Sequence, residues 1–162
     1  VNEKGGWDIG LFGFEAKVNN FEGLLDVSAN DLKTSEISIC SVHRFPIGRK
    51  LIPAKAFSES VAQEIELELS IAAINKGGFT VMGHPGGMSI RAHGAFKKEY
   101  FEEIIIACKK NEIAFDFNAS YHQNCKNNLL ELFRIHNPLI SIGSDAHRIE
   151  FIGNATRALF ND

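Results

Sequence analysis

The sequence has few cysteines and no long apolar segment. Only three of its 162 residues are cysteine, and they are widely spaced without a Cys-x-x-Cys pair. We therefore expect reduced thiols of an intracellular protein and no disulfide framework. No run of about 18 or more apolar residues occurs, so we expect no membrane-spanning helix. No signal peptide is recognisable at the start, and we expect a cytoplasmic protein.

An excess of basic residues is also absent. The chain has 17 Lys and Arg against 20 Asp and Glu, which gives a net charge of -3 and a pI near 6.1. Because proteins that bind nucleic acids normally carry a basic excess, we expect no nucleic-acid partner. With 44% hydrophobic residues, the chain is long enough for one sizeable core and too short for two. Residues 1–162 therefore form one predicted domain.

Short apolar segments alternate with helical patterns along the chain. Strands are predicted at residues 7–17, 37–42, 79–83, 113–117 and 139–143, with 24–27 as a hairpin partner of the first. Helices are predicted at residues 57–75, 96–111, 128–135 and 152–160. In the first helix, Phe57, Val61, Ile65 and Leu69 recur every four residues. Residues 64–69 also alternate as a strand would, but the segment is too long for a strand. The pattern indicates an α/β fold with a parallel sheet covered by helices.

Polar side chains lie at the carboxyl end of every predicted strand, where the functional residues of parallel α/β proteins collect. They are Glu15, His43, His84, Asp116, Asn118, Asp145 and His147. Each has an ordinary explanation when taken alone, since a histidine after a strand often only stabilises a loop and an aspartate before a helix is often its N-cap. Together they favour a metal site, because imidazole and carboxylate are the ligands of zinc, iron and manganese.

The remaining histidines and two of the cysteines are not expected to bind metal. His93 and His136 are expected to face solvent, and His122 lies near enough to the strand ends to reach a substrate. Cys40 and Cys108 fall inside a strand and a helix face and are expected in the core.

Four motifs resemble the PHP (polymerase and histidinol phosphatase) family, particularly its small stand-alone phosphoesterases. They are GFEA at residues 13–16 with NNFEG at 19–23, SVH at 41–43, HPG at 84–86, and GSDAH at 143–147 with a following IGN. The last two are the more specific. Together they cover the chain in order from about residue 13 to its end.

The resemblance implies a fold and a set of ligands. The family fold is a distorted (β/α)7 TIM-like barrel with three metal ions at its carboxyl rim. Glu15, His43 and His84 would serve one ion, with Glu15 bridging to a second that Asp145 would bind, and His147 would bind a third. Asn118 falls in a family segment that shapes the pocket.

One departure from the family pattern concerns the first strand, where the family has a His-x-His motif that this sequence lacks. The five predicted strands correspond to the last five of seven. We therefore expect the chain to be a C-terminal portion without the first two strand-helix units; the alternative is a member that has lost them. An incomplete barrel leaves apolar surface that residues upstream of Val1 or a second copy in a homo-oligomer would cover.

The expected activity is metal-dependent hydrolysis of a small phosphomonoester, with histidinol phosphate as the family's best-known substrate. Clustered divalent ions suit this reaction because they activate water and neutralise phosphoryl oxygens. Arg44 and Arg148 directly follow proposed ligands, and Arg91 lies in the loop after His84, so these three are candidates for binding phosphate. Two alternatives remain: a non-catalytic metal-binding or interaction module, and a hydrolase that acts on a carbon-nitrogen bond.

Overall fold

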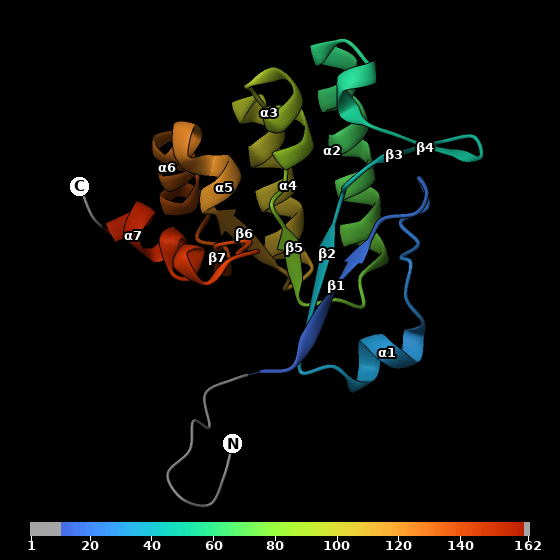
Figure 1. Ribbon diagram of the computed structural model, residues 1–162, viewed down its shortest axis with the longest axis horizontal. Helices are drawn as coiled ribbons and strands as arrows, with labels where there is room; N and C mark the ends of the chain where they lie inside the picture. The colour runs from blue at the N-terminus through green and yellow to red at the C-terminus, as the bar shows by residue number, and fades with distance from the viewer. Residues whose placement is uncertain (1–10, 161–162) are drawn as a thin grey trace, which may run out of the picture.

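A computed structural model describes residues 11–160, which form a parallel sheet flanked by helices (Figure 1). The main sheet has five strands in the order β1 (Gly13–Lys17), β2 (Ile37–Ser41), β5 (Val81–Gly83), β6 (Ala114–Asn118) and β7 (Ile140–Gly143). Every pairing is parallel, and neighbours in the sheet follow the order of the chain. The predicted α/β class is confirmed, and the arrangement is consistent with part of an α/β barrel.

Three long helices cover one face of this sheet. They are α2 (Glu59–Lys76), α4 (Lys98–Lys110) and α6 (Lys126–His136), and α4 packs against both of the others. Figure 1 shows α2 and α4 behind the strands. The core between the helices and the sheet is rich in aromatic and branched side chains, among them Leu69, Phe101, Ile104, Ile105, Phe115 and Phe117. On α4, the buried residues are Phe101, Ile104, Ile105 and Cys108.

Helix α2 buries only part of the stripe that recurs every four residues. Leu69 is fully buried, whereas Val61 is 40% exposed. The buried side includes Ala62, Glu66, Leu69 and Ala73. Small alanines allow the helix to pack closely, and the carboxylate of Glu66 has hydrogen-bond partners on the neighbouring segment, so its burial is compensated.

Several short elements were not predicted. They are α1 (Ala29–Thr34), the hairpin of β3 (Phe45–Ile47) and β4 (Lys50–Ile52), the 3-10 turns η1 (Ala54–Ala56), η2 (Gln123–Cys125) and η3 (Ile149–Phe151), and the helices α3 (Gly87–His93) and α5 (Ala119–His122). The last predicted helix is shorter, as α7 (Asn154–Phe160). The return of residues 24–27 is one antiparallel bridge between Val18 and Leu25, closed by backbone hydrogen bonds from Asn19 to Leu24 and from Asp26 to Lys17. Of the first predicted strand, residues 7–10 lie outside the described residues.

Helix α3 changes the place of one predicted site residue. Arg91, expected in a loop, lies on the last turn of this helix. Gly86 begins the helix with a φ of +76°, and a Cβ at that position would lie 2.7 Å from the ring of Phe96. Only glycine fits both restraints. Within residues 11–160, no helix combines the length and the apolar composition that crossing a bilayer requires.

Candidate metal centre

The candidate centre lies where three neighbouring parallel strands end. Strand β2 lies between β1 and β5, with Lys17 beside Ser41 and Ser41 beside Gly83. His43 follows β2 by two residues, His84 follows β5 directly, and Glu15 lies within β1. The parallel register therefore brings these three side chains to the same edge of the sheet.

Their ligand atoms converge. The Nε2 of His84 lies 3.2 Å from Oε1 of Glu15, and the Nε2 of His43 lies 3.4 Å from the same oxygen. One ligand atom from each residue lies within 4.8 Å of the other two. Two imidazole nitrogens and one carboxylate oxygen are a common set for a transition metal, whose bonds to them are about 2.0–2.2 Å long. The three residues could hold one ion between them.

Glu15, His43 and His84 shift one another's pKa values. The hydrogen bond with His84 holds the pKa of Glu15 down at about 2. Burial lowers the pKa of His43, and the positive charge on His84 lowers it further. Burial also opposes the charged form of His84, but the hydrogen bond and negative charge of Glu15 outweigh it, so the pKa of His84 is raised. These shifts favour the deprotonated forms of Glu15 and His43, which bind metal, and the protonated form of His84, so that a metal ion competes with a proton at His84.

The backbone around His84 is held by two buried carboxylates. His84 has a φ of +33°, which is unusual for a residue with a side chain, and its backbone N–H donates to Oδ2 of Asp116 over 3.2 Å. Four and five residues further on, the backbone N–H groups of Met88 and Ser89 donate to Oε1 and Oε2 of Glu66, at 3.0 and 2.7 Å. These contacts fix the loop that orients the His84 ring.

His122 was predicted near the substrate, and this is wrong. Its side chain is fully buried and both ring nitrogens have partners. The backbone N–H of Asn118 donates to Nδ1 over 3.0 Å, so Nε2 carries the proton and donates to the carbonyl of Pro85 over 2.8 Å. Burial lowers the pKa of His122 to about 4, so the ring is neutral and ties the end of β6 to the loop after His84.

Asn118, predicted to shape the pocket, is also buried. Its Oδ1 accepts from the backbone N–H of Ser120 and caps α5, and its Nδ2 donates to Asp116. Asn118 therefore supports the β6 end of the centre from within the protein. Gly143, its neighbour on β7, has no room for a side chain, because a Cβ there would lie 2.5 Å from Oδ1 of Asp116.

Asp145 and His147 follow β7 at the same edge but lie outside the three-residue cluster found within residues 11–160. The side chain of Asp145 is 24% exposed, and that of His147 is 84% exposed. Their closest side-chain approach is 3.8 Å. Arg148, a candidate for binding phosphate, is exposed beside Glu150 at 4.0 Å.

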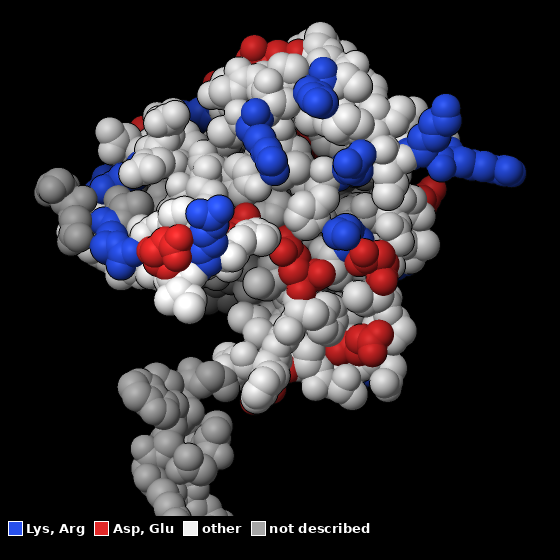
Figure 2. Space-filling view, in the orientation of Figure 1, with Lys and Arg blue, Asp and Glu red and all other residues white. Residues whose placement is uncertain are grey.

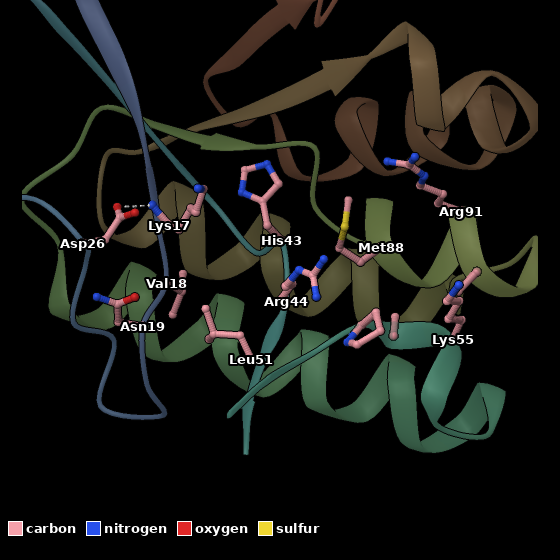
Figure 3. A pocket seen from close by; sticks show the side chains of 13 residues that line it. Lys17, Val18, Asn19, Asp26, His43, Arg44, Leu51, Lys55, Met88 and Arg91 are labelled. Atoms are coloured by element: carbon pink, nitrogen blue, oxygen red, sulfur yellow. Dashed lines mark hydrogen bonds between the residues drawn. The ribbon is translucent and has the colours of Figure 1, made fainter. Parts of the chain in front are cut away.

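A cavity of about 640 Å³ lies next to the cluster, and His43 forms part of its wall (Figure 3). Arg44 and Arg91, both predicted to bind phosphate, line it. Lys17 and Lys55 also line it and were missed by the sequence analysis. Lys17 could have been found, because it lies two residues from Glu15 on a strand and therefore on the same face. No sequence motif marks Lys55.

The two histidines expected in solvent are partly buried instead. The Nε2 of His136 lies 2.8 Å from Oε1 of Glu102, and this contact between α6 and α4 partly covers the ring. His93 ends α3, and its Nε2 is buried without a hydrogen-bond partner within the described chain. Cys40 and Cys108 are buried, as predicted.

Comparison with known proteins adds one relative. No family model matches the chain. A protein of Caldicellulosiruptor bescii named "Probable phosphatase" is 26% identical over 147 residues, which cover 87% of this chain and 54% of that protein. The chain is thus similar to a protein named as a phosphatase and spans about half of its length.

Proposed function

We propose that this chain carries a metal-binding part of a phosphatase that hydrolyses small phosphomonoesters. The observation that carries the proposal is the convergence of Glu15, His43 and His84 within 4.8 Å, beside a cavity that His43 lines together with cationic side chains. The name of the C. bescii protein supports the reaction class. The four PHP-like motifs support the family and its barrel.

Each residue has a role that follows from its position. A divalent ion held by Glu15 and the Nε2 atoms of His43 and His84 would supply Lewis acidity for ester hydrolysis. Arg44 and Lys17 line the cavity next to His43 and would bind phosphoryl oxygens. Asp145 follows β7 at the same edge of the sheet, and the PHP resemblance would give it a role beside a further ion.

The metals and the complete domain are part of the same proposal. Zinc, manganese or iron would suit the cluster, and His147 and Arg148 would contribute a third ion's ligand and a phosphate contact in the complete barrel. Strands β1 and β7 are the edges of the sheet, and Ile140 and Ile142 on β7 are exposed. Two preceding strand-helix units with a His-x-His motif, or a second copy of the chain, would cover these sheet edges. The gene sequence upstream of this chain distinguishes these two possibilities.

Metal retention tests the site directly. The purified chain, dialysed after loading with zinc or manganese, should retain one ion by elemental analysis. Glu15→Gln and His84→Asn should each weaken retention by at least about tenfold, since each removes a ligand. His136→Asn is the matched control, because His136 also contacts a glutamate but belongs to no candidate metal cluster within residues 11–160. Equal retention in His84→Asn and His136→Asn, or none in the unaltered chain, would refute the site.

Activity tests the reaction. We expect this chain alone to turn over poorly and the complete gene product, loaded with manganese or zinc, to hydrolyse small phosphomonoesters. His84→Asn should abolish hydrolysis, whereas His136→Asn should not affect it. Cleavage restricted to oligonucleotides, or no hydrolysis of any phosphate ester at full metal loading, would show that the assignment is wrong.

A further inference from the structure

The cavity beside the metal cluster has cations at two ends. Lys17 on β1 and Arg44 flank His43, whereas Lys55 in η1 and Arg91 on α3 lie on the other side (Figure 3). Helix α3 and η1 pack against each other, so Lys55 and Arg91 lie on neighbouring elements at one end of the cavity, which we call the α3–η1 corner. Figure 2 shows the same distribution from outside, with basic side chains over α3 and beside β3 and β4, and acidic ones over β1 and β2.

None of these cations has an ion-pair partner in the described part of the chain, although Arg91 has a side-chain hydrogen bond with Tyr121. The Lys and Arg ion pairs found within residues 11–160 lie elsewhere, at Lys98 with Glu131 and at Arg148 with Glu150. Asp26, the carboxylate of the cavity wall, accepts a hydrogen bond from the backbone N–H of Lys17 over 2.6 Å. Unpaired cations in a concave wall create a positive potential that attracts anions.

The cavity is larger than a single phosphoryl group needs. Its volume of about 640 Å³ is that of sites that take a whole small molecule. Its wall also includes the apolar side chains of Val18, Leu51 and Met88, and Met88 lies between the two groups of cations (Figure 3). The matching ligand has an anionic group at each end and a less polar part between them.

We propose that Lys55 and Arg91 form a binding site for a second anionic group of the substrate, a carboxylate or a second phosphate. The proposal rests on the proposed function, which places the hydrolysed phosphoryl group at the cluster of Glu15, His43 and His84. The substrate class is then a small phosphomonoester with a second anionic group, and the α3–η1 corner selects it over a neutral phosphomonoester.

Three matched probes test this site. Phenyl phosphate has one anionic group, while 4-carboxyphenyl phosphate and 1,4-phenylene bisphosphate add a carboxylate or a phosphate at the far end of the same ring. Calorimetry with the manganese-loaded chain should show at least one of the two probes with a second anionic group binding about tenfold more tightly than phenyl phosphate, the gain expected from a charge-assisted hydrogen bond. The probe that gains identifies the preferred group.

Variants separate the site from general electrostatics. In Lys55→Ala/Arg91→Ala, the ratio of the affinity for the probes with a second anionic group to the affinity for phenyl phosphate should fall to about one. Lys110→Ala/Arg134→Ala removes two exposed cations from α4 and α6 and should keep the ratio. An affinity ratio near one in the unaltered chain, or an unchanged ratio in Lys55→Ala/Arg91→Ala, overturns this inference. Binding of phenyl phosphate would still support the proposed function in that case. If none of the three probes binds, both this inference and the proposed function are wrong.

Discussion

Replacing Glu66 with alanine should destabilise the protein strongly, although glutamate is usually a surface residue of helices. Its carboxylate is fully buried and accepts the backbone N–H groups of Met88 and Ser89. Glu66→Ala would leave both donors buried without an acceptor. Because these donors begin the helix that follows the His84 loop, the change should also loosen the metal ligand.

The magnitude follows from the two lost hydrogen bonds. A buried donor without a partner costs about 1–3 kcal/mol, so two such donors cost about 2–6 kcal/mol. Burial raises the pKa of Glu66, which means that its charged form is itself costly in the folded protein. Removing that cost offsets part of the loss, and we expect Glu66→Ala to lower the free energy of unfolding by about 2–4 kcal/mol.

Urea unfolding followed by circular dichroism measures this change. Glu68→Ala, at an exposed position of the same helix, is the control and should lie within about 0.5 kcal/mol of the unaltered chain. Glu66→Gln keeps one acceptor oxygen and should lose roughly half as much as Glu66→Ala. Metal affinity should fall in both Glu66 variants and not in the control. A Glu66→Ala variant as stable as Glu68→Ala would refute the reasoning.

Two further predictions concern the same region. The raised pKa of His84 favours its protonated form, so metal affinity should increase as pH rises through the titration of this residue and fall at acidic pH. Calorimetry in two buffers should detect the proton that His84 releases on metal binding. A metal affinity that is independent of pH would contradict the cluster. Gly143→Ala places a Cβ 2.5 Å from Oδ1 of Asp116 and should lower stability by about 1–3 kcal/mol, and an unchanged melting temperature would show that the β6–β7 contact is looser than described.

The class of the fold and the central cluster could be read from the sequence. The strands are short apolar segments, and Glu15, His43 and His84 lie at or just after three of them. Parallel strands align their carboxyl ends by geometry, so residues at these positions meet without any knowledge of the loops. The same rule places Asp145 at the edge, but the conformation of its loop decides how near it comes to the cluster.

Only the tertiary structure decided which polar residues are buried. Glu66 and His122 belong to residue types that are usually exposed, and their burial depends on hydrogen-bond partners from distant segments, such as the carbonyl of Pro85. The cavity and the place of Lys55 in it likewise arise from packing between η1 and α3. The sequence thus determined the strands and the ligands at their ends, because periodicity and strand direction are local properties. The surroundings of those ligands were settled by contacts between segments far apart in the chain, which local patterns do not specify.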